Sequence, residues 1–192
     1  PVNVGSVHIL LGAPLPGEAE RTPVMAENVG AMLPGKGDLA DEVIIVGGHL
    51  DHLGMGYFGS RSGPGELHPG ADDNASGAAG LLVLGKQLSE TFAGDERDRR
   101  TIVLIGFDAE ESGLNGARHY VTDPIGSLDD HVLMINWDMI GRITNERLTV
   151  AGGFSGEGLN DFIQPILDDS GLEIVVPAQM SGASDHLPFY QS

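Results

Sequence analysis

The chain has 192 residues, and 28 acidic against 10 basic side chains give it a formal net charge of −18. This length suits one domain with a sizeable core, while the charge argues against nucleic acid or an anionic membrane as a partner, since both need clustered Lys or Arg. The lack of cysteine in the sequence excludes disulfides, thiolate metal sites and cysteine nucleophiles. No apolar run approaches the roughly 20 residues that span a bilayer, so no membrane insertion is expected.

The first part of the chain favours β-strands. Residues 4–11 alternate between apolar and other side chains, which is typical of a strand with one buried face. A Pro- and Gly-rich turn is expected over 12–21, and a further strand over 24–33. Residues 43–46 are a short β-branched run without alternation, which indicates a strand buried on both faces, as in a parallel sheet.

Helices and strands alternate through the rest of the chain, which predicts an α/β fold. Gly77, Gly80 and Gly85 lower helix propensity in the first of these helices, so we expect close packing against a sheet there. Pro165 implies a kink or a late start in the last helix. The expected elements are helices over 75–90, near 114–121 and around 159–167, and strands over 101–107, 131–137, 148–150 and 172–176.

Side chains that can bind metal follow three of the apolar strands. They are His49 after the first, Glu110 and Glu111 after the second, and Asp138 after the third. Since open α/β sheets bind ligands outside the carboxyl ends of their strands, we expect these groups to converge. Asp73 joins them from the start of the helix that follows. A histidine with several carboxylates suits zinc, and manganese or cobalt are also possible.

The adjacent carboxylates Glu110 and Glu111 favour a division of roles. One can coordinate a metal while its neighbour acts as general base toward the metal-bound water. Asp51, two residues after His49, could accept the second imidazole N–H and fix the tautomer. His52 lies close to this motif in sequence and, like His68, is not assigned as a ligand.

Each of these residues has a commoner structural role when taken alone. A histidine after a strand is usually a loop residue, and Asp72, Asp73 and Asn74 before a helix are usually a cap and dipole partner. Here, however, imidazole and carboxylate groups occur together at three strand ends and one helix start. Their joint occurrence favours a metal site over several independent structural roles.

Five motifs match a known family in that family's order. They are Gly-Gly-His49-Leu-Asp51-His-Leu-Gly, Gly-Ala-Asp-Asp73-Asn74-Ala-Ser-Gly, Ala-Glu110-Glu111-Ser-Gly, Asn-Trp-Asp138-Met-Ile-Gly and Ser-Asp185-His186-Leu-Pro-Phe. Over about residues 24–192 the chain resembles the co-catalytic di-zinc aminopeptidases, which are related to glutamate carboxypeptidase and glutaminyl cyclase. The resemblance implies a three-layer α/β fold, with a mostly parallel mixed central sheet and helices on both faces.

The resemblance also implies up to two zinc ions and a role for each matching residue. The implied metal ligands are His49 and Asp138 for one zinc, Glu111 for the other, and Asp73 as a bridge between them. Glu110 would be the general base while a metal-bound hydroxide attacks the peptide carbonyl. Supporting roles fall to Asp51, Asn74, Asp185 and His186, with a cis peptide between Asp73 and Asn74.

The second zinc and the chain ends are expected to be incomplete. In this family the second zinc takes a further histidine downstream of the Ser-Asp-His motif, and the printed sequence stops at Ser192 before such a segment. We therefore expect one firm and one poor metal site. Residues 1–192 are expected to form a single catalytic domain cut at both ends, with 1–23 as a seam.

The expected function is a zinc-dependent metallo-exopeptidase that hydrolyses N-terminal peptide bonds, secreted or periplasmic by family analogy. Its expected partner is a peptide substrate. A carboxypeptidase or dipeptidase on the same scaffold is an alternative. So is a catalytically weak or silent binding module, as in transferrin-receptor ectodomains. A glutaminyl-cyclase-like acyl transfer at a single zinc is a more distant option.

Overall fold

A five-stranded mixed sheet forms the centre of the protein. The computed structural model describes residues 2–9, 24–57, 59–180 and 184–192. The strands are β1 (Val2–Ile9), β2 (Val24–Leu33), β3 (Val43–His49), β4 (Thr101–Phe107) and β5 (His131–Asn136). They lie in the order β1-β2-β4-β3-β5. The β1–β2 and β2–β4 pairs are antiparallel, whereas β3 pairs in parallel with both β4 and β5.

The expected strands of the sheet are all present, with small shifts at their ends. Strand β2 covers the predicted range 24–33, and β5 ends one residue before the predicted 137. Strand β3 is almost fully buried, as its unbroken β-branched run predicted. Residues 10–23 lie outside the described part of the chain, so the turn over 12–21 and most of the proposed seam stay predictions.

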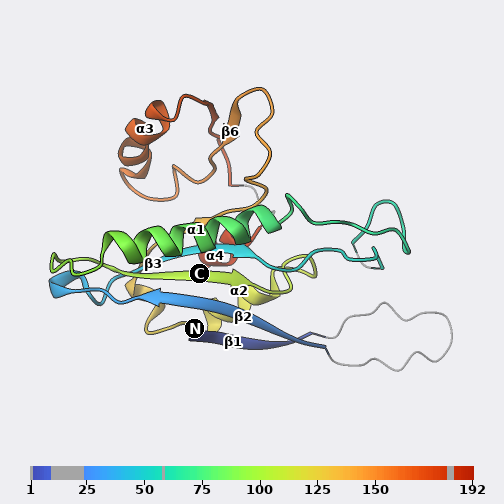
Figure 1. The fold of residues 1–192 in the computed structure, drawn as a ribbon, viewed down its shortest axis with the longest axis horizontal. Coiled ribbons are helices and arrows are strands. Elements are labelled where there is room, and N and C mark those ends of the chain that lie inside the picture. The colour runs from blue at the N-terminus through green and yellow to red at the C-terminus, as the bar shows by residue number, and fades with distance from the viewer. Residues whose placement is uncertain (1, 10–23, 58, 181–183) are drawn as a thin grey trace.

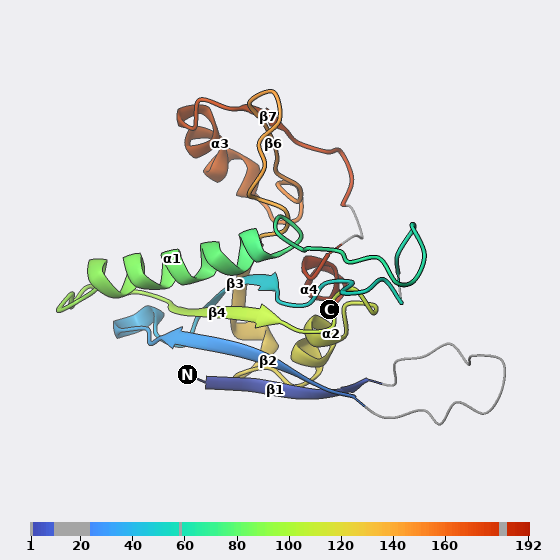
Figure 2. The ribbon, with the colours of Figure 1, turned by 45° about the vertical axis from the view of Figure 1, so that its right-hand side comes forward.

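Helices cover both faces of this sheet. Helix α1 (Ala75–Thr91) runs along one face, and α2 (Asn115–Thr122) lies on the other (Figures 1 and 2). A further helix that the sequence did not suggest, α4 (His186–Gln191), packs against α2 and β5. The expected α/β fold with helices on both faces is therefore confirmed.

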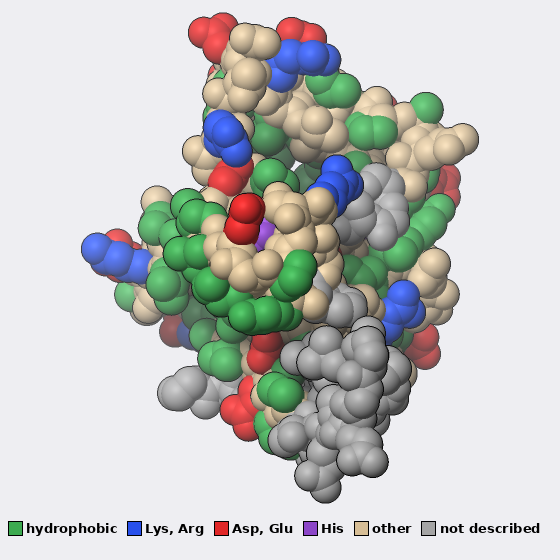
Figure 3. Space-filling model, turned by 90° about the vertical axis from the view of Figure 1, so that its right-hand side faces the viewer, with side chains coloured by type: hydrophobic (Ala, Val, Ile, Leu, Met, Phe, Trp, Pro, Cys, Tyr) green, Lys and Arg blue, Asp and Glu red, His purple; other side chains and the backbone are tan. Residues whose placement is uncertain are grey.

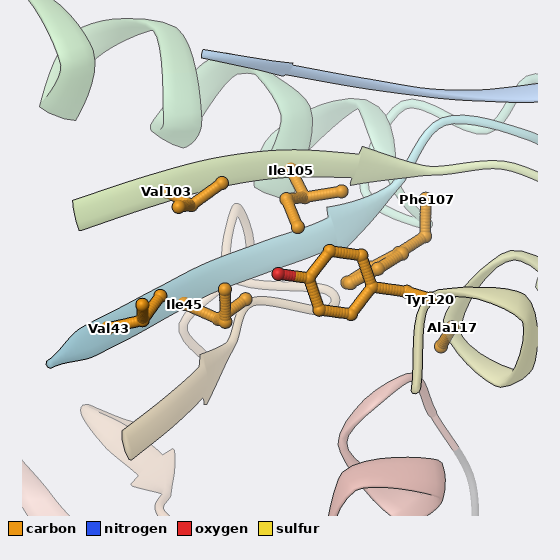
Figure 4. Packing of buried hydrophobic residues seen from close by; sticks show 7 residues of the cluster. All are labelled: Val43, Ile45, Val103, Ile105, Phe107, Ala117 and Tyr120. Atoms are coloured by element: carbon orange, nitrogen blue, oxygen red, sulfur yellow. The ribbon is translucent and has the colours of Figure 1, made fainter. Parts of the chain in front are cut away.

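The hydrophobic core lies between the sheet and α2. Side chains from β3 and β4 point toward the side chains of α2 (Figure 4). The Phe107 ring meets the Tyr120 ring edge-on, at 6.3 Å between centroids, and the Phe189 ring of α4 at 6.0 Å. The cluster consists of Val43, Ile45, Val103, Ile105, Phe107, Ala117 and Tyr120. This packing fixes the positions of β3 and β4, whose ends carry the candidate site.

Glycines let α1 approach the end of β5 closely. A Cβ on Gly77 would lie 2.4 Å from the backbone oxygen of Trp137, and one on Gly80 would lie 2.9 Å from the Trp137 ring. A Cβ on Gly48, in β3, would lie 2.8 Å from the same Trp137 oxygen. The expectation that close packing compensates for glycine in this helix is confirmed. The contact brings the start of α1 next to the residues that follow β5.

A smaller lobe lies beyond α1 (Figures 1 and 2). It contains β6 (Arg147–Thr149), α3 (Leu159–Asp169) and β7 (Glu173–Val175), and its two strands pair in parallel. Helix α3 begins at Leu159 with Pro165 inside it, so the late start considered for this helix is wrong. The 3-10 turns are η1 (Gly37–Leu39) and η2 (Leu128–Asp130). None of the helices in the described residues is long and apolar enough to cross a membrane.

Candidate metal centre

Three strand ends and one helix start meet at one edge of the sheet. His49 is the last residue of β3, Glu110 and Glu111 follow β4, and Asp138 follows β5. These strands are parallel to one another, so their carboxyl ends share an edge. Asp73 reaches the same place from the start of α1. The convergence predicted from the strand ends is thus present.

His49, Asp73 and Asp138 form a first set of possible metal ligands. Their donor atoms lie within 4.8 Å of one another. The distance from His49 Nε2 is 3.2 Å to Asp73 Oδ1 and 3.5 Å to Asp138 Oδ1. Ligands of one tetrahedral zinc lie about 3.3–3.6 Å apart, given zinc–ligand distances of about 2.0–2.2 Å. The two distances from His49 Nε2 therefore lie within about 0.1 Å of the spacing that such an ion requires.

The electrostatics of this first set favour a bound cation. Among the described residues, no hydrogen-bond partner reaches the buried Oδ1 of Asp138. Burial alone would lower the pKa of His49, but contact with Asp138 and the charge of Glu110 outweigh it and raise the pKa to about 9. Burial alone would raise the pKa of Asp138, but contacts with His49 and Ser184 outweigh it and lower the pKa. Several carboxylates thus surround a single charged imidazole, so the site has an excess of negative charge that a cation would offset. Imidazole nitrogen and carboxylate oxygen are ligands that zinc binds.

A second set consists of His52, Asp73 and Glu111, whose donor atoms also lie within 4.8 Å of one another. The distance from His52 Nδ1 is 2.6 Å to Glu111 Oε1 and 3.8 Å to Asp73 Oδ1. Asp73 Oδ1 is close to both histidines, which is the position of a bridging carboxylate. His52 was left out of the ligands expected from the sequence. Its place three residues after His49, in a His-x-Asp-His run, was the available signal.

Glu110 stands apart from its neighbour Glu111, because neither set includes it. Burial raises the pKa of the Glu110 carboxyl from 4.5 to about 7, and the charges of Glu111 and Asp138 add to this against the opposing charge of His49. A carboxylate with a pKa near neutrality beside a metal site is suited to take up and release a proton. The geometry is thus compatible with the expected division of roles.

Asp51 supports the site differently from the expectation. His49 Nδ1 hydrogen-bonds to the backbone carbonyl of Asp51 at 3.0 Å, while the Asp51 carboxylate is 3.8 Å away. This carboxylate instead accepts the backbone N–H groups of Glu110 and Glu111, at 2.9 and 3.2 Å. The Asp51 carbonyl therefore orients the imidazole, and its side chain ties the end of β3 to the segment after β4.

Asn74 connects α1 to the end of β5. Its Oδ1 accepts the N–H groups of Gly77 and Met139, and its Nδ2 donates to the Trp137 carbonyl at 2.8 Å. The helix cap is therefore Asn74 and not Asp72. The Asp72 carboxylate instead accepts the N–H of Gly141 and so supports the segment that follows Asp138. Asn74 holds both neighbours of Asp138.

The peptide bond between Asp73 and Asn74 is cis, as the resemblance implied.

Asp185 is fully buried next to the site, and among the described residues neither of its carboxylate oxygens has a hydrogen-bond partner. Burial raises its pKa from 3.8 to about 8, and the charge of Glu110 adds to this. His186 begins α4, and its charge acts on Asp138. Ser184 accepts a hydrogen bond from Asn136 at 2.7 Å, which connects this motif to β5. Neither metal set includes Asp185 or His186.

Figure 3 views the molecule from the end toward which β3 and β4 run. In this view acidic and histidine side chains reach the surface among hydrophobic ones. The segment from β3 to α1 contributes exposed apolar side chains at Leu50, Met55, Tyr57 and Leu67. Apolar surface therefore lies along the segment that carries Asp51 and His52.

Known proteins share this sequence pattern and fold. A probable zinc metalloprotease of Pyrenophora teres f. teres is 35% identical over 131 residues, which is 66% of this chain and 25% of the relative. A probable leucine aminopeptidase of Arthroderma otae is 28% identical over 142 residues, which is 73% of this chain and 37% of the relative. This chain therefore spans between a quarter and two fifths of the length of these relatives.

A solved structure agrees with the sequence relatives. The zinc aminopeptidase BSAP from Bacillus subtilis superposes with a TM-score of 0.61 at 25% identity, covering 87% of this chain and 38% of that one. The model of peptidase family M28 matches residues 28–192, a range that includes every residue of both metal sets. The chain belongs to peptidase family M28.

Proposed function

We propose that this chain carries the catalytic centre of a zinc-dependent exopeptidase that removes residues from the N-termini of peptides. One observation carries the proposal. Two possible ligand sets share Asp73, and a carboxyl group with a pKa raised to about 7, Glu110, lies beside them without belonging to either. This is the combination that metal-assisted hydrolysis needs, because one group must move a proton while others hold the ion.

The residues of both sets would hold the metal. Bound zinc would polarise the scissile carbonyl and lower the pKa of a water molecule at the site. Glu110 would accept the proton of the attacking water and deliver it to the leaving amine, for which a pKa near neutrality is suited. Asp51 keeps Glu110 in place by accepting its backbone N–H.

The choice of the N-terminus rests on the charge of the whole chain and on the relatives. Bound zinc would offset the charge of the carboxylates that hold it, but the chain as a whole has a net charge of −18. A negative protein surface attracts the ammonium group of a free N-terminus. Relatives named leucine aminopeptidase agree with this choice over a carboxypeptidase. A secreted or periplasmic location stays a prediction from the family resemblance.

An activity assay with matched substrates tests the proposal. We expect zinc-dependent hydrolysis of amino-acid anilides to the free amino acid and the aniline, little hydrolysis of N-blocked anilides, and loss of activity on chelation. Glu110→Gln removes the proton acceptor but keeps shape, so it should lower kcat by about 10²–10⁴-fold while zinc content stays unchanged. Equal cleavage of free and blocked substrates would refute the N-terminal preference. Unchanged kcat in Glu110→Gln would refute the assigned role of this residue.

A further inference from the structure

The second ligand set includes His52, which belongs to the same sequence motif as His49. His52 lies three residues after His49, and its Nδ1 is 2.6 Å from Glu111 Oε1 and 3.8 Å from Asp73 Oδ1. We propose that His52 Nδ1 is a ligand of a second zinc ion, together with Asp73 and Glu111. The inference rests on the proposed zinc peptidase and goes beyond it, because it adds a ligand that the sequence motifs did not assign.

The position of Asp73 supports two neighbouring ions. Its Oδ1 is 3.2 Å from His49 Nε2 and 3.8 Å from His52 Nδ1, so one carboxylate lies between two imidazoles. Metal ions in two-metal sites lie about 3.5–4 Å apart, a separation that a single carboxylate can bridge. The 3.8 Å distance is slightly longer than the spacing of about 3.3–3.6 Å between ligands of one tetrahedral zinc. The His52 and Asp73 side chains are 20% and 36% exposed, so neither of them is enclosed by tight packing.

The contact between His52 and Glu111 is short because, without a metal ion, the two side chains are joined by a hydrogen bond. At 2.6 Å, His52 Nδ1 and Glu111 Oε1 share a hydrogen bond. Two ligands of one zinc must lie farther apart, so metal binding would displace the proton and widen the distance by roughly 0.7–1 Å. Both side chains are about one fifth exposed, which leaves room for this shift.

The surrounding structure holds these two residues together and gives access to them. The Asp51 carboxylate accepts the N–H of Glu111 at 3.2 Å, so the segment that carries His52 is tied to the segment that carries Glu111. A cavity of about 180 Å³ is lined by His52, Asp51 and Glu111, with side chains from β2 on its other side. An ion can reach the pair from this cavity.

The neighbouring His68 provides a matched control. Its ring is 6.1 Å from the His52 ring, edge to face, and its Nε2 hydrogen-bonds to Ser60 at 2.9 Å. It belongs to neither ligand set in the described residues. Replacing it removes an imidazole from the same loop without removing a proposed ligand.

Zinc titration by calorimetry is the first test, with the chain and the variants His52→Asn and His68→Asn. We expect two sites in the unmodified chain and in His68→Asn. In His52→Asn the first site should remain, while the affinity of the second falls by more than about 100-fold, beyond the 10–100-fold that loss of an orienting hydrogen bond causes. A fall of about 100-fold or less would overturn the proposal, because loss of an orienting contact accounts for it. No zinc binding by the unmodified chain would overturn the proposed function as well.

Cadmium NMR of the unmodified chain with isotope-labelled histidine is the second test, and it does not depend on the folding of a variant. We expect scalar coupling between one cadmium ion and His52 Nδ1, and between the other and His49 Nε2. If His52 Nδ1 keeps its proton in the cadmium-loaded protein, the residue only orients Glu111 and the proposal is wrong. Coupling to His49 alone would overturn this proposal and leave the proposed function intact.

Discussion

Asp185→Asn should flatten the pH dependence of stability in the metal-free protein. The Asp185 carboxyl is fully buried, and its pKa is raised from 3.8 to about 8. Between these two values the folded protein holds a proton on this group, whereas the unfolded chain has lost it. Stability must therefore fall as pH rises through this window. Asparagine resembles the protonated acid in shape and does not titrate.

The size of the stability change follows from the pKa shift of Asp185. Each pKa unit corresponds to about 1.36 kcal/mol, so full ionisation of Asp185 costs on the order of 5 kcal/mol of unfolding free energy. Two further groups act in the same direction. The pKa of Glu110 is raised from 4.5 to about 7, so its ionisation also destabilises the fold as pH rises. The pKa of His49 is raised from 6.5 to about 9, so its charged form stabilises the fold fully below pH 6.5, and this stabilisation is lost as pH rises through 9. The slope should thus decrease in the variant without disappearing.

Urea unfolding in the presence of a chelator, at about pH 5 and about pH 8, measures the effect. The unmodified chain should lose several kcal/mol more than Asp185→Asn between these conditions. Asp41→Asn, which replaces an exposed carboxylate two residues before β3, is the matched control and should behave like the unmodified chain. Equal losses in the unmodified chain and Asp185→Asn would refute the idea that burial keeps this carboxyl protonated.

Two further substitutions test how the site is supported. Asn74→Ala leaves the Trp137 carbonyl and two N–H groups without their side-chain partner, so we expect a loss of about 2–4 kcal/mol in urea unfolding and weaker zinc binding; zinc affinity equal to that of the unmodified chain would contradict the role of Asn74 in placing Asp138. Ile45→Ala empties a fully buried position in β3 and should cost about 2–5 kcal/mol in the same assay; a cost below 1 kcal/mol would show that the core is not packed around this residue.

Local patterns were enough for most elements and for the first ligand set. The β-branched runs marked β3 and β4 because strands buried on both faces need apolar residues at every position. The rule that ligands collect at the carboxyl ends of parallel strands then brought His49 and Asp138 together. Helix α4 was not suggested by local pattern. Its stability comes from tertiary contacts, with Pro188 buried and Phe189 packed on Phe107.

What the sequence by itself determined is the kind of chemistry, since residue type alone limits the donors to imidazole and carboxylate and the motif order identifies the family. Only the tertiary structure placed His52 among the donors of the second set. The place of His52 depends on distances between segments remote in sequence, 59 residues apart for its contact with Glu111. The same holds for Asp51, whose carboxylate turns to the Glu110 and Glu111 N–H groups because they lie within reach after folding. Such contacts depend on how β3 and β4 align, and no local pattern encodes that alignment.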